Sequence, residues 1–511
     1  MRKSLLRDLQ IIALLLLLSF IIQILFLNPP ILSDHIEYYF SAIKFPHLLE
    51  QPTHWSLRIG LILPVAVLYR IFGNTEIAYY CFPLVSTTIL SIGIYFIGSM
   101  LFNRRVGLFS ALWSIFIPSI LLESGQLLPD IPATTCIVAG FAILISFKEL
   151  HNNKDPKAIE RKNKWFFFIA GALFGWSYLI KEYFIIFSLL IPLAFWAYEI
   201  PYRNLIPVSV GIFFMFGIEA LFGLIYYDDI FVRFLATNPR EISGYIEKNA
   251  ALVIKYFPTL LSRKGGEGTT ILGGIAVIYL SIQAIKKDKS SIFLLSWILL
   301  IYCFFTFLGL LPIIFSWEDI VLLRLHIFRY WILILPPLII GGIAAVENYL
   351  IKISQKLKIK NYIVNPIINT ILVILLFFSG LRGISSIYDN PNLIRNGADY
   401  YIELRNYLSE NNSSDDVIWI NRESKIAFDR IFPMYTRTFW GRKIWDGTIK
   451  YLNTDGEYLR EDEITFGKVI VDRYYLKSEF YSFPNYFTTP PENWKLVFES
   501  ENRRIAIYSI E

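Results

Sequence analysis

Two acidic positions in this sequence have the residue type and the setting for proton transfer. Asp34 follows the first long apolar run, within the stretch SDHIEYY that also contains Glu37. Asp130 lies in LLPDIP, immediately before another apolar run. A carboxylate at the end of a membrane helix is partly desolvated and held in a fixed position, and both conditions can tune it as a general base. Asp34, Asp130 and Glu37 are therefore candidate catalytic residues.

Helix capping is the competing interpretation of the same residues. Ser33 or Asp34 can cap the helix that follows, with Glu37 completing a capping box. Asp130 can cap its own helix, since Pro132 stands shortly after the expected start. Such caps are common. Capping and catalysis are compatible when one carboxylate oxygen stays available, so both interpretations remain open.

Four cations are expected at a similar depth, namely Arg58, Lys181, Arg324 and Arg329. A charged group at the end of a membrane span faces water, a partner or an anionic ligand, because facing lipid is costly. Two guanidiniums beside one span, Arg324 and Arg329, can bind a phosphate through paired hydrogen bonds. The alternatives are that Lys181-Glu182 is a charged break between two spans and that the arginines reach toward lipid headgroups. These cations are the candidate residues for binding a donor phosphate.

Histidines near the carboxylates leave a divalent metal site open as a further alternative. Four of the five histidines, His35, His47, His54 and His326, fall in the same set of loops. Together with the carboxylates they could hold a divalent cation, although no tight ligand spacing such as HExxH occurs. There is also no Walker loop, no GxGxxG after a strand and no Ser/His/Asp signature. The sequence therefore gives no support to soluble nucleotide chemistry and names no certain cofactor.

The composition indicates that membrane helices position these residues. Hydrophobic residues make up 55% of the 511 residues and charged residues only 18%, against roughly 25% charged in soluble domains. A lipid-facing segment must satisfy its own backbone hydrogen bonds, so each long apolar run should be a helix. The segment 55–72 is expected to lie in the interface, because Arg58 and Arg70 bracket it and Pro64 interrupts it. We predict about eleven transmembrane helices, at 9–27, 76–102, 106–122, 131–147, 165–180, 182–199, 205–226, 270–285, 291–312, 327–346 and 366–383.

The distribution of Lys and Arg among the loops predicts the orientation. Cations gather in alternate connections, whereas the connections 123–130 and 313–323 contain no Lys or Arg. This pattern places the N-terminus in the cytoplasm and the C-terminus outside the cytoplasmic membrane. The first apolar run is then a retained anchor rather than a cleaved signal peptide, and the loop 28–75 that holds Asp34 is extracytoplasmic.

Beyond about residue 390 the pattern changes to that of a small domain. Residues 395–408 have helical spacing, and DDVIWIN, KVIVDRYYL and WKLVFESENRRIAIYSI have the alternation of strands, the last as a hairpin. From Ile384 onward there are 16 Lys or Arg against 20 Asp or Glu. A mildly acidic tail after a basic membrane part excludes a nucleic-acid-binding face. We predict a transmembrane domain at 1–385 and an extracytoplasmic α/β domain at 386–511.

The order of these features resembles the C-type polytopic glycosyltransferases, specifically the branch of protein O-mannosyltransferases and bacterial lipid A aminoarabinose transferases. The matching elements are the acidic residue after the first span, RIGLILPVAVLYRIFG, LLPDIPATT, WSYLIKEYFIIF and FRYWILILPPLI. They extend over approximately residues 1–385. The chain departs from the family in three ways. His35 follows Asp34 where an adjacent acidic pair is usual, and two further spans of the relatives are not apparent. The oligosaccharyltransferase-like motif WWDYG is absent, and residues 445–447 resemble it only in part.

The resemblance implies an inverting membrane enzyme that uses a polyprenyl-phosphate-linked sugar. It assigns Asp34 as the general base and Asp130 as the second acidic position, and it implies that Arg58, Lys181 and Arg329 contact the donor phosphate. The acceptor hydroxyl would belong to a lipid, a glycan or a protein. Two other functions stay open at this point. One is a transporter or flippase of lipid-linked sugars without transfer chemistry, and the other is a non-catalytic scaffold whose tail recruits partners.

Overall fold

The structure is a computed structural model of the 511-residue chain. It describes residues 2–27, 34–46, 53, 55–73, 75–151, 156–233, 250–262, 266–314, 328–359, 361–388, 399–411, 416–420, 448–454, 457–473, 484–501 and 503–510.

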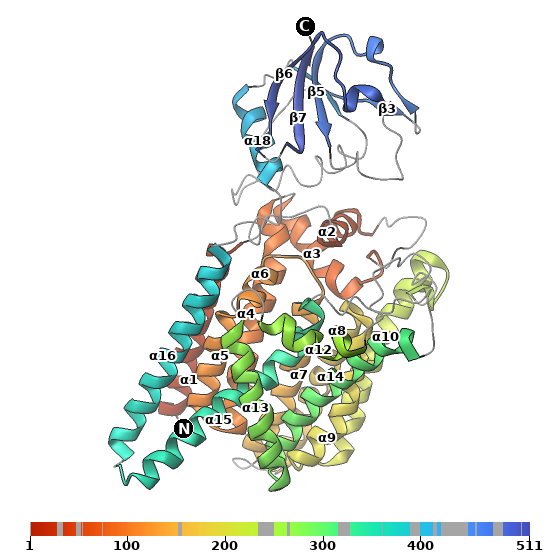
Figure 1. The fold of residues 1–511 in the computed structure, drawn as a ribbon. Coiled ribbons are helices and arrows are strands. Elements are labelled where there is room, and N and C mark those ends of the chain that lie inside the picture. The colour runs from red at the N-terminus through yellow and green to blue at the C-terminus, as the bar shows by residue number, and fades with distance from the viewer. Residues whose placement is uncertain are drawn as a thin grey trace.

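A bundle of helices forms the part of the chain before residue 389 (Figure 1). The long helices run side by side, and α2 and α3 lie across one end of the bundle (Figure 1). The α-helices are α1 (Arg2–Leu25), α2 (Asp34–Lys44), α3 (Ile59–Phe72), α4 (Glu76–Leu101), α5 (Arg104–Ile115), α6 (Pro118–Ser124), α7 (Asp130–His151), α8 (Pro156–Ile180), α9 (Leu190–Ala197), α10 (Leu205–Tyr227), α12 (Ala250–Ser262), α13 (Glu267–Ile285), α14 (Lys289–Ile314), α15 (Leu335–Lys356) and α16 (Asn361–Tyr388). The 3-10 segments η1 (Glu182–Leu189), η2 (Tyr202–Asn204) and η4 (Phe328–Ile334) adjoin these helices.

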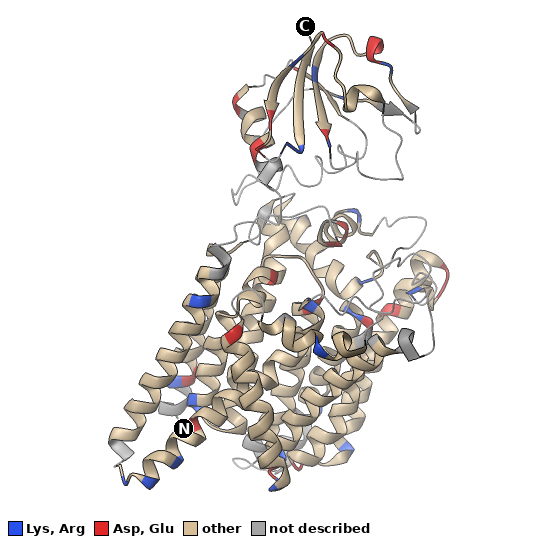
Figure 2. Cartoon of the chain, viewed as in Figure 1, with Lys and Arg blue, Asp and Glu red and all other residues tan. Residues whose placement is uncertain are grey.

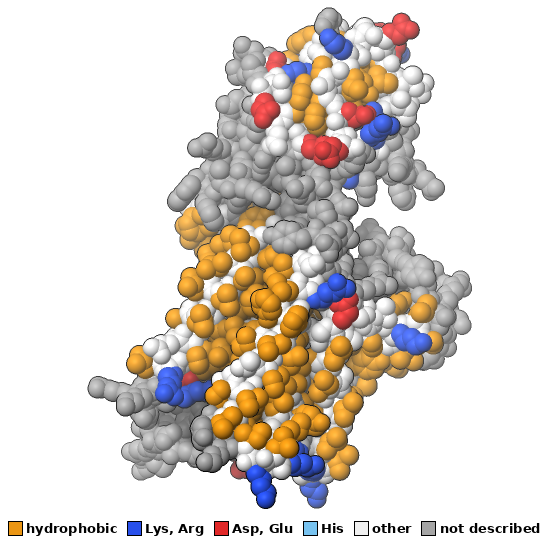
Figure 3. Space-filling model, turned by 60° about the vertical axis from the view of Figure 1, so that its left-hand side comes forward, with side chains coloured by type: hydrophobic (Ala, Val, Ile, Leu, Met, Phe, Trp, Pro, Cys, Tyr) orange, Lys and Arg blue, Asp and Glu red, His pale blue; other side chains and the backbone are white. Residues whose placement is uncertain are grey.

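The outer surface of the bundle is apolar enough to face lipid. Within the described residues, eight helices are long and apolar enough to cross a membrane, or nine if the bent pair α5 and α6 forms one span. Apolar side chains cover the side of the bundle, as Figure 3 shows, and large ones such as Phe213 and Phe378 are each 67% exposed. Charged residues gather mostly near the two ends (Figure 2). The chain is therefore a helical polytopic membrane protein.

The eleven predicted spans all coincide with apolar helices, but three of them differ from a simple crossing. The predicted span 106–122 is bent by 62° between α5 and α6. Pro118 begins α6, and its missing N–H cannot continue the hydrogen-bond ladder of α5. The runs at 164–180 and 184–197 are shorter apolar helices. The number of eleven crossings stays a prediction.

Two glycines allow α8 and α10 to cross at very short range. A Cβ on Gly171 would lie 2.0 Å from the Val208 carbonyl oxygen, and a Cβ on Gly211 would lie 2.2 Å from that of Phe168. Any larger residue would force the two backbones apart. The crossing fixes the position of α8 against α10. It therefore also helps to position Lys181, which directly follows the last residue of α8.

In its described residues, the C-terminal part contains a small mixed sheet and the helix α18 (Asp399–Asn411). The strands are β1 (Val417–Ile420), β2 (Thr448–Tyr451), β3 (Asn453–Thr454), β4 (Glu457–Tyr458), β5 (Gly467–Asp472), β6 (Trp494–Glu499) and β7 (Ile505–Ile510). The order of strands in the larger sheet is β2-β1-β5-β7-β6. In this sheet β1 is parallel to β2 and β5, while β7 is antiparallel to β5 and β6. The three predicted strand runs are confirmed as β1, β5 and the β6–β7 hairpin, whereas β2 was not predicted. Residues 445–447 lie outside the described residues. The sheet is found beyond the end of the bundle that carries α2 and α3 (Figure 1).

Candidate active site

Asp34 is the first residue of α2 and contacts a helix that is distant in the sequence. Its Oδ2 accepts a hydrogen bond from Arg329 Nη2 at 2.8 Å, and its Oδ1 accepts one from Trp55 Nε1 at 3.3 Å. The side chain is 34% exposed. Burial by itself would raise the pKa of Asp34, but the Arg329 guanidinium and the two hydrogen bonds lower that pKa below its usual value. Asp34 is therefore a carboxylate at neutral pH and keeps partial access to solvent.

Arg329 joins the two candidate carboxylates. It is the second residue of η4, which runs directly into α15. Its Nη2 contacts Asp34, while its Nε lies 4.0 Å from Asp130 Oδ2. The guanidinium also lies over the ring of Tyr330, with 5.5 Å between Cζ and the ring centroid. Asp34 and Asp130 therefore both lie beside the Arg329 side chain.

Asp130 and Lys181 form a buried ion pair. Asp130 begins α7 and Lys181 follows α8, and their side chains are 3% and 4% exposed. Lys181 Nζ donates to Asp130 Oδ1 at 2.5 Å and lies 4.2 Å from the ring centroid of Tyr330. A buried pair loses much of its electrostatic gain to desolvation and so contributes little net stability. Ionisable groups held at this cost inside a membrane protein commonly serve function.

Arg58 belongs to a second group of charges beside the first. It precedes α3, and its Nη1 donates to the hydroxyl of Tyr38 on α2. Its Nη2 lies 3.4 Å from Glu182 Oε2, and Arg233 Nη2 lies 3.2 Å from Oε1 of the same carboxylate. Arg233 also pairs with Glu219 on α10. Because Glu182 is adjacent to Lys181 in the chain, the two groups of charges are joined through the end of α8.

Sequence reasoning missed part of this arrangement. In the sequence, Glu182 enters only the alternative in which Lys181-Glu182 is a charged break between two spans, and Arg233 lies in a long loop to which the charge rule gives little weight. Trp55 and Tyr38 are two of the 85 Phe, Tyr and Trp residues in the sequence, so their type alone gives no signal. The adjacent ionisable residues Lys181 and Glu182 do give one signal. Each of them could have been expected to have a charged or polar partner, because an unpaired charge inside the membrane domain is costly.

The remaining predicted site residues are less closely tied to these contacts. Glu37 lies one turn beyond Asp34, and its backbone carbonyl accepts a hydrogen bond from Ser41 Oγ. His35 is buried, and burial together with the nearby Arg329 lowers its pKa to about 4, so the imidazole is neutral at neutral pH. Arg324 lies outside the described residues, as do the three histidines at 47, 54 and 326.

Cations lie beside the carboxylates at this site. In the part of the chain that the structure describes, no group of three or more His, Cys, Asp and Glu side chains is placed to hold a metal. The carboxylates Asp34 and Asp130 instead face the cations Arg329 and Lys181. Cations already gathered in a partly dry site can stabilise a phosphate by charge-assisted hydrogen bonds.

Comparison with known proteins gives the same family as the sequence resemblance. Residues 63–218 match the sequence profile of the family described as dolichyl-phosphate-mannose-protein mannosyltransferase. Among curated proteins, no sequence matches the chain significantly.

Solved structures show the fold over nearly the whole length of the chain. ArnT from Cupriavidus metallidurans in the apo state has a TM-score of 0.56 at 11% identity, covering 99% of this chain and 98% of that chain. The same protein bound to undecaprenyl phosphate has a TM-score of 0.55 at 12% identity, covering 98% and 97%. The apo oligosaccharyltransferase of Archaeoglobus fulgidus has a TM-score of 0.53 at 12% identity, covering 99% and 74%. The resemblance predicted from the sequence is thus confirmed: part of the chain is similar to the dolichyl-phosphate-mannose-protein mannosyltransferases, and the chain has the fold of ArnT.

Proposed function

We propose that this protein transfers a sugar from a polyprenyl-phosphate donor to a hydroxyl acceptor at the outer face of the cytoplasmic membrane. The observation that carries the proposal is the convergence of Asp34, Asp130, Lys181 and Arg329, which come from four separate elements and contact one another in pairs. The structure of ArnT with undecaprenyl phosphate supports the same donor class. The acceptor is a lipid, a glycan or a protein.

The cations would bind and stabilise the donor phosphate. Lys181 and Arg329 lie on either side of Asp130, and Arg58 lies beside Tyr38 and Glu182. A departing polyprenyl phosphate is a good leaving group and needs positive charge more than it needs a proton. Fixed cations aimed at the charge that grows in the transition state are an effective form of such catalysis. Arg324 remains a predicted member of this group of phosphate-binding cations.

Asp34 would act as the general base of an inverting displacement. Its carboxylate takes the proton of the acceptor hydroxyl while that oxygen attacks the anomeric carbon. The bond between the anomeric carbon and the phosphate oxygen breaks, and the polyprenyl phosphate leaves with the bonding electrons. General-base help of this kind is worth roughly 10²–10⁴-fold in rate. Asp130 would hold Lys181 and Arg329 in position, and Glu37 is the third candidate carboxylate in the same loop.

The proposal includes the predicted topology. Eleven crossings would put the N-terminus in the cytoplasm and the domain at 386–511 outside, next to the catalytic loop 28–75. The C-terminal sheet lies beyond the end of the bundle that carries α2 and α3, and this arrangement supports the assignment of both to one side (Figure 1).

The test compares cells that lack the gene with cells that express wild-type protein, Asp34→Asn or Asp228→Asn. Mass spectrometry of surface glycolipids and glycoproteins reports the transfer product. We expect one sugar mass to disappear without the gene, to return with wild type and Asp228→Asn, and to stay absent with Asp34→Asn despite normal membrane insertion. Asp228 is a matched control, because it is an exposed residue in a left-handed conformation that asparagine adopts readily. Restoration of the product by Asp34→Asn would contradict the role of Asp34 as base.

A further inference from the structure

A groove opens between α8 and α10 at the end of these helices that is remote from Asp34. Lys164 on α8 precedes Lys181 by 17 residues, which is about 25 Å along the helix axis at 1.5 Å per residue. The close crossing at Gly171 and Gly211 brings the two backbones together. Beside this crossing lies a cavity of about 620 Å³. Its lining residues are Lys164, Trp165, Phe168, Arg203, Asn204, Ile206, Pro207 and Val210.

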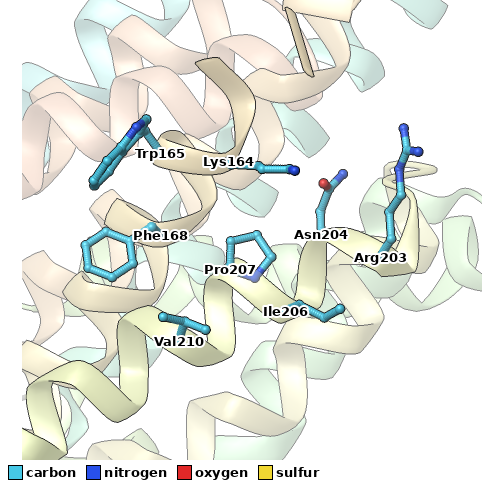
Figure 4. Close-up of a pocket in the computed structure, with 8 residues that line it drawn as sticks. All are labelled: Lys164, Trp165, Phe168, Arg203, Asn204, Ile206, Pro207 and Val210. Carbon is cyan, nitrogen blue, oxygen red and sulfur yellow. The ribbon is translucent and has the colours of Figure 1, made fainter. Parts of the chain in front are cut away.

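The groove is polar at one end and apolar at the other. In Figure 4 the ammonium group of Lys164 points toward Asn204 and Arg203, while Trp165 and Phe168 lie at the opposite end above Val210. Two cations and an amide can bind a phosphate, since ammonium and guanidinium groups are strong donors to phosphate oxygens. The ring and aliphatic surfaces beyond them match an acyl chain.

The groove faces the surroundings of the bundle rather than its interior. The side chains of Trp165 and Ile206 are each 68% exposed, and Val210 is 52% exposed. Large apolar side chains exposed on a membrane span face lipid, and a tryptophan at the end of a span is typical of the headgroup level. The groove therefore opens to the leaflet opposite the candidate active site.

We propose that this groove binds an anionic glycerophospholipid of that leaflet. Its headgroup phosphate contacts Lys164 and Arg203, with Asn204 as a further donor, and one acyl chain lies along Trp165, Phe168 and Val210. Basic pockets between membrane helices commonly bind anionic headgroups. The bound lipid would pack beside the crossing of α8 and α10 and so support it.

Lipid binding to the purified full-length protein tests the proposal by native mass spectrometry. The protein is offered equal amounts of phosphatidylglycerol and phosphatidylcholine. We expect a preference for phosphatidylglycerol, reduced about fivefold for each cation replaced in Lys164→Gln/Arg203→Gln, because one interfacial Lys or Arg contributes on the order of that factor. Val210→Trp should also reduce binding, since the indole fills the apolar end while both cations remain. Unchanged thermal unfolding shows that each variant is folded.

Lys286→Gln is the matched control. Lys286 follows the last residue of α13 at an exposed position and does not line the groove, so we expect wild-type binding. Equal loss in this control would show that general surface charge attracts the lipid, and equal binding of phosphatidylcholine would show an ordinary boundary lipid. Displacement of phosphatidylglycerol by an equal amount of undecaprenyl phosphate would assign the groove to a prenyl phosphate instead. Each of these three results would overturn the proposal, and none of them depends on the sugar-transfer reaction.

Discussion

The guanidinium of Arg329 controls the protonation of Asp34 through direct contact. Burial raises the pKa of Asp34, while Arg329 and the hydrogen bonds lower it, and the net effect is a pKa below the usual value of about 3.9. The substitution Arg329→Gln removes the cation while Asp34 stays buried, so the pKa of Asp34 should rise. We expect the acid limb of the transfer rate to move to higher pH in this variant, because the base must be ionised to accept a proton.

Rates of sugar transfer measured between about pH 4 and pH 8 check this expectation at the residue scale. Arg58→Gln provides the control, because Arg58 contributes to the cation group but is not among the residues that set the pKa of Asp34. It should lower the rate without moving the acid limb. Superimposable acid limbs for wild type and Arg329→Gln would show that another group limits the rate at low pH.

The candidate residues could be predicted from the sequence, but their pairing could not. Asp34, Asp130, Lys181 and Arg329 each stand at the end of an apolar run, where a charge is costly and therefore informative. The contact between Asp34 and Arg329 joins residues that are 295 positions apart. Nothing in the local pattern states which helix ends meet, and for the same reason Glu182 and Arg233 were not recognised as partners.

At the scale of elements, periodicity and length predict the helices well, whereas bends and close crossings depend on tertiary contacts. Hydropathy places α4, α7 and α10 within a few residues. The 62° bend between α5 and α6 was missed because a proline can also be accommodated within a membrane helix. The short η4 before α15 begins a predicted span, yet its first residues turn as a 3-10 segment and direct Arg329 toward the carboxylates.

The crossing of α8 and α10 gives a prediction at this scale. Gly171→Ala would place a methyl group 2.0 Å from the Val208 carbonyl oxygen, and the helices would have to separate. We expect a loss of about 1–3 kcal/mol in stability, seen as a lower temperature of thermal unfolding in detergent. Gly217→Ala on α10 is the control, because nothing lies within 4 Å of the added Cβ and alanine favours the helix. Equal unfolding temperatures for both variants would show that the crossing tolerates separation.

At the scale of the whole molecule, the orientation in the membrane decides which compartment supplies the acceptor. The C-terminal sheet and the end with α2 lie on one side of the bundle (Figure 1). Loops rich in Lys and Arg are expected to face the cytoplasm, and their distribution in the sequence predicts that the side with the sheet and α2 is extracytoplasmic. Cysteines introduced singly at two exposed positions can test the orientation. Lys495→Cys lies in β6, and Lys286→Cys lies at the end of α13, both in exposed positions.

A membrane-impermeant maleimide added to intact cells should label Lys495→Cys and should label Lys286→Cys only after permeabilisation. The natural cysteines at 81, 136 and 303 lie in α4, α7 and α14, and the chain without an introduced cysteine gives their background. The reverse pattern would place Asp34 and its cations on the cytoplasmic side. A donor presented at the outer leaflet could then not reach them, because the phosphate headgroup stays at its own interface, and transfer would have to use an acceptor and a donor from the cytoplasm.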